Sequence, residues 1–102
     1  MKIEFYSERK LKKEIINIIR KYLDLKKYKV FFFGSRVTRK GSEHSDIDVG
    51  IEGPKPIPSE AFLDIQEEIE NLPILYKIEI VDFNRVDERF LKVALQHIEP
   101  IN

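Results

Sequence analysis

Hydrophobic residues along this chain recur with two periods, and each period indicates one kind of element. In three stretches they recur every three or four positions, which is the spacing of the buried face of an amphipathic helix. These stretches cover residues 8–23, about 60–72 and about 88–98. A residue that suits the N-cap position precedes each of them: Ser7, Ser59 and Asp87. The pattern therefore predicts three helices that each present one apolar face.

Shorter segments between the helices follow a strand pattern. Residues 30–33 form a β-branched and aromatic run that Gly34 stops. Residues 46–51 and 76–83 alternate between apolar and polar side chains, as strands with one buried face do. Because strands and helices alternate, the sequence predicts an α/β (α+β) fold, a small mixed β-sheet with helices packed on one face and the acidic site on the other. The length suits a single domain, residues 1–102.

Two acidic residues, Asp46 and Asp48, lie in the second of these strands. Side chains in a strand change face at every residue, so these two project the same way, with Cα atoms about 7 Å apart. Two carboxylates on one open face repel each other unless a cation lies between them. The chain has no cysteine, and hard oxygen ligands favour Mg²⁺ or Mn²⁺ over zinc. We therefore expect a divalent metal at these two acids.

The segment before these acids suits an anion. Gly34 and Ser35 predict a turn after the first strand, and residues 36–40 carry three cations. A turn that leads into a short helical segment presents backbone N–H groups, a hydroxyl and a helix N-terminus to a phosphate. A metal site and a phosphate site side by side indicate a nucleotide.

These residues resemble the signature of a known family. Gly34-Ser35, then Arg36, Gly41-Ser42 and Ser45 to Asp48 are similar to the GS…DxD pattern of the DNA polymerase β-like nucleotidyltransferase superfamily. Within that superfamily the short chain resembles the minimal nucleotidyltransferases, the antitoxin-like partners of HEPN-domain proteins. The likeness extends to the later strand around Glu79, so it covers most of the chain.

The resemblance implies a two-metal nucleotidyltransferase that uses ATP or another NTP and releases pyrophosphate. Two Mg²⁺ ions, or Mn²⁺, would carry the triphosphate and activate the acceptor. The family pattern assigns metal binding and catalysis to three carboxylates: Asp46, Asp48 and Glu79. It assigns phosphate and nucleotide binding to four residues near the turn: Gly34, Ser35, Arg36 and Arg39.

Two acids in the last predicted strand are candidates for the third carboxylate of the site. They face opposite sides of the sheet, because one is an odd-numbered and the other an even-numbered residue of the strand. Glu79 alternates with Ile78 and Ile80, so it faces the open side when they face the core. Asp82 shares the parity of the isoleucines and stands at the strand end, where an acid typically caps or turns the chain. The resemblance favours Glu79, although the usual family residue there is Asp. The sequence alone leaves both candidates open.

The identity of the group that receives the nucleotide follows only from the resemblance. Minimal nucleotidyltransferases are similar to enzymes that transfer AMP to a tyrosine of a HEPN-domain toxin and so silence it, which makes them antitoxins of a toxin–antitoxin system. The expected function is therefore transfer of AMP from ATP to a hydroxyl of such a partner. An alternative is a non-catalytic antitoxin subunit that neutralises its partner by complex formation, and Glu79 in place of Asp favours it.

Composition narrows the cellular setting. No segment approaches the roughly 20 apolar residues of a membrane span, and the N-terminus lacks the pattern of a signal peptide. We therefore expect a cytoplasmic protein without membrane contact. The formal net charge is zero, yet residues 1–29 hold ten Lys or Arg and four acids, a local charge of +6. This polarity suits an acidic partner surface or a solvated helix face, and direct nucleic-acid binding is not expected.

Overall fold

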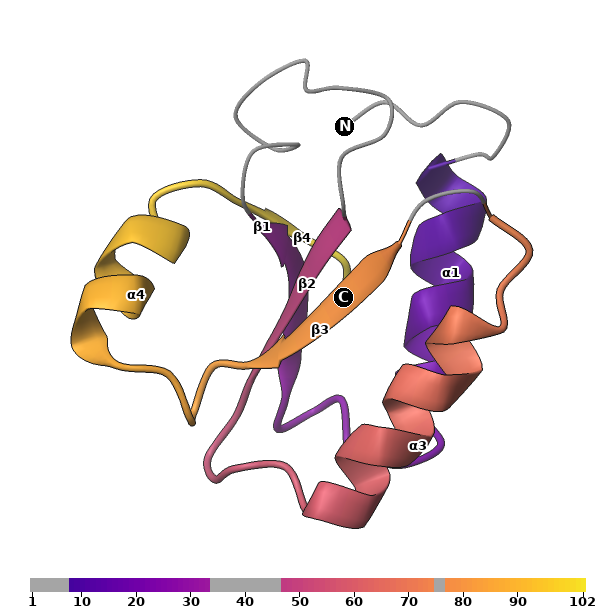
Figure 1. The fold of residues 1–102 in the computed structure, drawn as a ribbon, viewed down its shortest axis with the longest axis horizontal. Coiled ribbons are helices and arrows are strands. Elements are labelled where there is room, and N and C mark those ends of the chain that lie inside the picture. The colour runs from indigo at the N-terminus through magenta and orange to yellow at the C-terminus, as the bar shows by residue number, and fades with distance from the viewer. Residues whose placement is uncertain (1–7, 34–46, 75–76) are drawn as a thin grey trace.

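The computed structural model describes residues 8–33, 47–74 and 77–102. Within these ranges the chain forms three helices and four strands (Figure 1). None of these helices is long and apolar enough to cross a membrane. In chain order the elements are α1 (Glu8–Ile19), β1 (Lys29–Phe33), β2 (Ile47–Glu52), α3 (Ser59–Glu70), β3 (Ile78–Asp82), α4 (Glu88–Ala94) and β4 (Ile98–Pro100).

The four strands form one mixed sheet in the order β3-β2-β1-β4. β2 and β3 run parallel and are joined through α3, whereas β1 pairs antiparallel with both β2 and β4. In the middle of the sheet, Val49 pairs with Phe32 on one side and with Ile80 on the other. The small α+β domain with a mixed sheet that the sequence predicts is confirmed.

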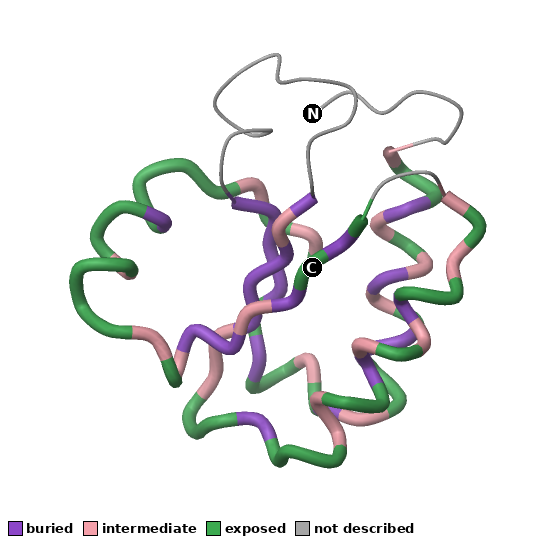
Figure 2. The backbone as a smooth tube through the Cα atoms, viewed as in Figure 1, coloured by how far each residue is buried: buried purple, intermediate pink, exposed green. Residues whose placement is uncertain are grey.

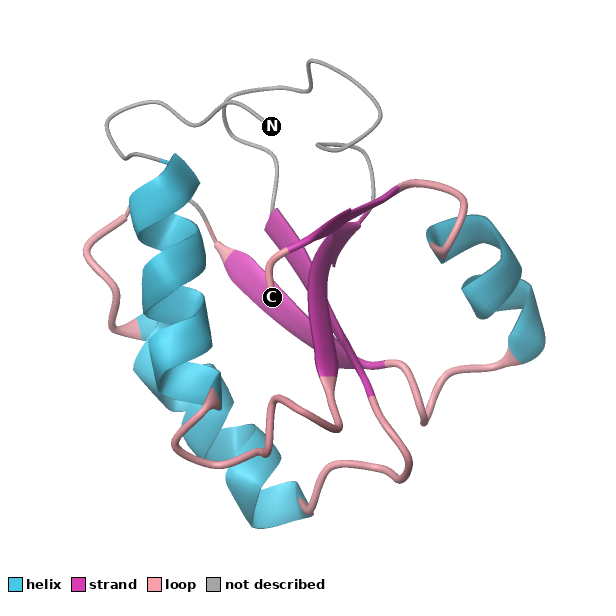
Figure 3. Ribbon diagram, turned by 180° about the vertical axis from the view of Figure 1, so that it is seen from behind, coloured by secondary structure: helices cyan, strands magenta, loops and turns pink. Residues whose placement is uncertain are grey.

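α1 and α3 cover one face of the sheet, as their apolar stripes require (Figure 3). In β2 the alternating Ile47, Val49 and Ile51 are at most 1% exposed and point into this layer. Figure 2 shows that buried residues lie along the strands and on the sides of α1 and α3 that face them. The helices add their own stripes to this core: Leu11, Ile15, Ile18 and Ile19 from α1, and Ile65 and Ile69 from α3.

A polar contact ties the end of α1 to α3. Lys21 and Tyr22, which follow α1, both donate to the Glu68 carboxylate. The hydrogen bond from Lys21, and to a smaller extent the one from Tyr22, lowers the pKa of Glu68. In turn, the hydrogen bond to Glu68 raises the pKa of Tyr22 to about 12. Both hydrogen bonds are therefore fully formed between pH 4.5, the ordinary pKa of the carboxyl group, and pH 10.0, the ordinary pKa of the phenol. It weakens when pH falls through the lowered pKa of Glu68 or rises through the raised pKa of Tyr22.

The opposite face carries a second cluster, which is aromatic, and α4 lies on that side (Figure 1). Phe31 and Phe33 of β1 pack edge to face against Phe83, with ring centroids 4.8 and 5.0 Å from it. Ala94 contributes from α4. The face that carries the acidic residues is therefore covered in part by one helix, while α1 and α3 share the other face.

The last helix is shorter than the sequence pattern predicts, because the residues after it form a strand. α4 ends at Ala94, and Ile98–Pro100 pairs antiparallel with β1 as β4. Beyond β4, the Ile101 N–H donates to the Val30 carbonyl at 2.8 Å, and the Asn102 side chain accepts from the Val30 N–H at 2.8 Å. A proline is tolerated here because β4 is an edge strand.

The predicted helix boundaries are corrected at two further places. α1 ends at Ile19 instead of residue 23, and the chain continues there as a turn. The N-cap of α3 is Pro58, without a side-chain hydrogen bond, and Ser59 is the first helical residue. Asp87 caps α4 as predicted, because its side chain accepts from the backbone N–H three residues later at 2.8 Å. Ser7 lies outside the described residues.

Gly50 of β2 leaves room for the aromatic cluster. A Cβ atom there would lie 2.4 Å from a ring carbon of Phe31 and 2.6 Å from one of Phe83. We predict that Gly50→Ala lowers the free energy of unfolding by about 1–3 kcal/mol, because the added methyl group overpacks the cluster. Urea denaturation of the variant beside the wild type measures this change. A loss below about 0.5 kcal/mol, as an ordinary surface substitution gives, would contradict the packing.

Candidate active site

Two acidic side chains meet on one face of the sheet, Asp48 from β2 and Glu79 from β3. The parallel pairing puts their Cα atoms in register, and neighbouring strands lie about 4.8 Å apart. Each residue alternates with buried apolar residues, so both side chains are on the face opposite α1 and α3. Asp48 is partly buried and Glu79 is exposed. The two strands therefore bring one acid each to the same place.

A hydrophobic residue and a cation flank this acid pair. Phe33 of β1 is the register partner of Asp48 on its other side, and it is buried in the aromatic cluster. Lys77 comes just before β3, and its Nζ lies 3.5 Å from a Glu79 carboxylate oxygen. Sequence reasoning did not single out Phe33 or Lys77 for the site. The alternation of a strand would have placed Lys77 on the same side as Glu79.

The acid pair lies at the end of the sheet where the chain passes from β1 to β2. β1 ends at Phe33, and β2 starts at Ile47, one residue before Asp48 (Figure 1). Of the seven site residues that the sequence predicts, the structure places Asp48 and Glu79 and brings them together. The other five lie outside the described residues: Gly34, Ser35, Arg36, Arg39 and Asp46.

Asp48 and Glu79 provide hard oxygen donors of the kind that Mg²⁺ and Mn²⁺ prefer. A cation between them would also offset the repulsion of two carboxylates held on adjacent strands. Within residues 8–33, 47–74 and 77–102, no three His, Cys, Asp or Glu side chains gather closely enough to hold a metal ion. The donor set is therefore compatible with a divalent cation but needs a further ligand, and Asp46 is the one that the sequence predicts.

Comparison with known families supports this interpretation of the fold. A family model described as "Polymerase beta, Nucleotidyltransferase" matches residues 4–101. The chain belongs to this nucleotidyltransferase family. No curated protein sequence matched it.

Solved structures share the nucleotidyltransferase fold at low sequence identity. A chain from a toxin–antitoxin complex with AMP-PNP matches with a TM-score of 0.72 and 15% identity, over 89% of this chain and 72% of that one. A chain from the complex of the tri-AMPylated Shewanella oneidensis HEPN toxin with the MNT antitoxin matches with a TM-score of 0.71 and 14% identity, over 94% and 72%. A chain from the MntA–HepT toxin–antitoxin gives 0.65 and 12%, over 93% and 72%.

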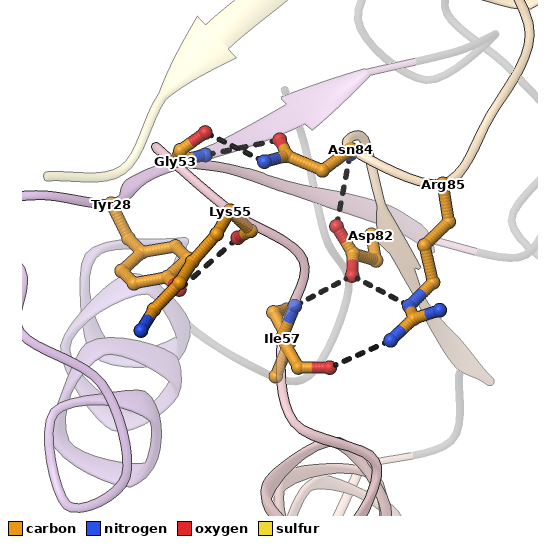
Figure 4. A network of polar contacts seen from close by, with 7 residues as sticks. All are labelled: Tyr28, Gly53, Lys55, Ile57, Asp82, Asn84 and Arg85. Atoms are coloured by element: carbon orange, nitrogen blue, oxygen red, sulfur yellow. Dashed lines mark hydrogen bonds and ion pairs between the residues drawn. The ribbon is translucent and has the colours of Figure 1, made fainter.

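Asp82, the other acid of β3, takes a structural position in this nucleotidyltransferase domain (Figure 4). It is 7% exposed, and its carboxylate accepts from the backbone N–H groups of Ile57 and Asn84, both at 2.9 Å. The Nε of Arg85 lies 3.3 Å from one of its oxygens. Asp82 therefore ties the end of β3 to the loop before α3, in agreement with the turn role that its parity predicted.

A second pair of hydrogen bonds closes the same end of the sheet (Figure 4). The Asn84 side chain donates to the Gly53 carbonyl at 2.7 Å and accepts from the Gly53 N–H at 3.3 Å. The Tyr28 hydroxyl donates to the Lys55 carbonyl at 3.2 Å. These contacts fix the proline-rich loop after β2, which the sequence predicts as irregular. The loop braces the end of the sheet opposite the acid pair.

The two acids of β3 should respond differently to neutralisation. We predict that Asp82→Asn lowers the free energy of unfolding by about 1–3 kcal/mol, because a buried N–H loses its acceptor and Arg85 loses its charge partner. Glu79→Gln should change it by less than about 0.5 kcal/mol, because that side chain is exposed. Urea denaturation of both variants measures the difference. Equal losses, or a larger loss for Glu79→Gln, would contradict the assigned positions.

Proposed function

We propose that this chain transfers AMP from ATP to a tyrosine hydroxyl of a HEPN-domain partner protein and so acts as its antitoxin. The observation that carries the proposal is the pair Asp48 and Glu79, held in register on one sheet face of a domain of the Polymerase beta nucleotidyltransferase family. Acids fixed on two rigid neighbouring strands suit a reaction that depends on positioning and charge neutralisation.

Within this proposal each residue has a defined task. Asp46, Asp48 and Glu79 would hold divalent ions, which would neutralise the charge of the triphosphate when bound. Phe33 keeps one side of Asp48 apolar, and Lys77 orients Glu79 through its ion pair. The remaining residues bind the nucleotide: Gly34 and Ser35 contact the phosphates, and Arg36 and Arg39 neutralise the charge that develops on the leaving pyrophosphate.

The proposed reaction is a single in-line displacement. The tyrosine oxygen attacks the α-phosphorus of ATP, and a new oxygen–phosphorus bond forms as the bond to the bridging oxygen of the β-phosphate breaks. Pyrophosphate leaves with that oxygen, and the tyrosine proton passes to the carboxylates of the site. The product is a tyrosyl AMP ester on the partner, and no oxidant or reductant is needed.

The choice of partner is supported by what the similar structures contain. They are described as toxin–antitoxin complexes, one with AMP-PNP and one with a tri-AMPylated HEPN toxin beside its MNT antitoxin. These descriptions concern those proteins. At 14–15% sequence identity the likeness establishes only a shared fold for this chain. The partner and the acceptor are therefore part of the proposal.

We predict that the purified chain labels the HEPN-domain protein encoded beside it when both are incubated with Mg²⁺ and ATP labelled at the α-phosphate. Asp48→Asn should reduce the labelling at least about 100-fold, because the site loses one of its fixed charges. Asp64→Asn is the matched control, since Asp64 is an exposed acid on α3 away from the pair. It should label like the wild type, and mass spectrometry should place the AMP on tyrosine.

The same assay separates the proposal from the non-catalytic alternative. A stable complex with the partner and no labelling with any of the four nucleotides would establish a binding-only antitoxin. Labelling that persists in Asp48→Asn would exclude the assigned site. Glu79→Gln and Asp82→Asn extend the comparison, because loss of labelling in a fully folded Glu79→Gln protein identifies Glu79 as the third carboxylate.

A further inference from the structure

Exposed large hydrophobic side chains gather in one segment of the part of the chain that the structure describes. Four of the five lie in α4 and the residues that lead into β4: Phe90, Val93, Leu95 and Ile98. The fifth, Leu63, is on α3, which covers the other face of the sheet. A single exposed leucine is ordinary on a protein surface, whereas a group of exposed apolar residues typically marks a contact with another molecule.

The pairing of the strands connects this segment with the acid pair. Glu79 of β3 pairs with Asp48 of β2. On its other side Asp48 pairs with Phe33 of β1, which pairs in turn with Ile98 of β4. Register partners on neighbouring strands project from the same face of a sheet. The four side chains therefore form one row on the face opposite α1 and α3, with two acids at one end and two apolar residues at the other.

A salt bridge on the opposite face agrees with this direction of Ile98. The carboxylate of the next residue, Glu99, lies 2.9 Å from the Nζ of Lys12 on α1, so Glu99 points to the face that α1 covers. Because side chains alternate along a strand, Ile98 points to the face of the acid pair. It is 39% exposed there. The row from Glu79 to Ile98 crosses three strand spacings, about 14 Å.

Phe33 joins this row to α4, which lies on the same side of the sheet (Figure 1). The ring centroid of Phe90 is 5.9 Å from that of Phe33, and Phe90 is 39% exposed. Leu95 follows α4 directly, three residues before Ile98, and is 40% exposed. Apolar surface therefore extends from Phe33, beside Asp48, outward over Phe90, Leu95 and Ile98. These last three residues are called the α4–β4 surface below.

The acid pair can be approached by another protein only over the face that carries α4, because α1, α3 and the core fill the other face. The two ends of the row differ in what such a protein would meet. At one end, Glu79 and the exposed Lys77 are charged, and a contact there must desolvate them. At the other end, burial of the α4–β4 surface removes apolar area from water, which is favourable. The apolar end is therefore the better contact for an acceptor protein.

We propose that the α4–β4 surface is the docking site of the acceptor protein, which packs apolar side chains next to its tyrosine on Phe90, Leu95 and Ile98. This role rests on the proposed AMP transfer, because the acceptor of that reaction is the occupant. The surface has no charged group, so it contributes to recognition and leaves the chemistry to the acid pair. The acceptor that it suits is a tyrosine with exposed apolar neighbours, on a surface that can reach across the row.

Titration calorimetry of the chain with the HEPN-domain protein of the labelling assay, without nucleotide, measures docking independently of transfer. Leu95→Lys and Ile98→Lys should each raise the dissociation constant at least about tenfold, because a charge enters an apolar contact. Leu63→Lys is the matched control, since it makes the same change at an exposed leucine on the other face. It should bind like the wild type, and circular dichroism should show that all three variants are folded.

The kinetics of labelling provide a second readout. In Leu95→Lys and Ile98→Lys the KM for the acceptor protein should rise by the same factor as the dissociation constant. The rate at saturating acceptor and the KM for ATP should stay within about twofold of the wild type, because a contact that acts only in binding changes KM and leaves kcat unchanged.

Unchanged binding in both variants would overturn the docking site, as would an equal loss in Leu63→Lys or a wild-type chain that does not bind the acceptor. A raised KM for ATP with unchanged acceptor binding would assign the surface to the nucleotide instead. A dimer of the chain alone that Ile98→Lys dissociates would assign it to a second copy. Weakened binding in a chain that never labels the acceptor would support the docking site and overturn the AMP transfer, whereas labelling with unchanged binding would do the reverse.

Discussion

The parallel register between β2 and β3 is the constraint on which the rest of this structure depends. It sets Asp48 beside Glu79 and, in the same step, sets the buried Val49 beside Ile80. The two results are inseparable, because side chains in a strand alternate between faces. A slip of one residue in either strand would send an acid into the apolar layer under α1 and α3. The hydrophobic core therefore enforces the position of the acids, although none of its residues contacts a substrate.

The contacts that secure this register lie at the far end of the strands from the acid pair. Asp82 binds the loop before α3, and Asn84 binds Gly53 after β2, so the carboxyl ends of β2 and β3 are tied together. Glu79 itself has less local support, since it is exposed and its ion pair is with a flanking lysine. Sites built on strands are positioned more precisely than sites built on loops. The bracing at the far end of β2 and β3 therefore also helps to position the acid pair.

Much of this arrangement could be predicted from the sequence because it rests on local periodicity. The alternation around Ile47 and Ile78 predicts which acids share the open face, and the place of Asp82 at the strand end predicts its turn role. β4 could not be predicted in this way. Its residues continue an apolar spacing of three and four, and their strand form depends on pairing with β1, which is distant in the sequence. The position of α4 has the same origin, because it is set by the aromatic cluster on the second face.

The phosphate-binding half of the site remains a prediction from sequence and family, since residues 34–46 lie outside the described ranges. What the structure adds is a separation of roles within one strand. In β3, odd-numbered side chains face the acid pair and the aromatic cluster, even-numbered side chains enter the core, and even-numbered backbone groups face the free edge. Chemistry and stability therefore depend on different side chains of the same five residues. Substitutions at Glu79 and Asp82 can therefore alter one of these properties at a time.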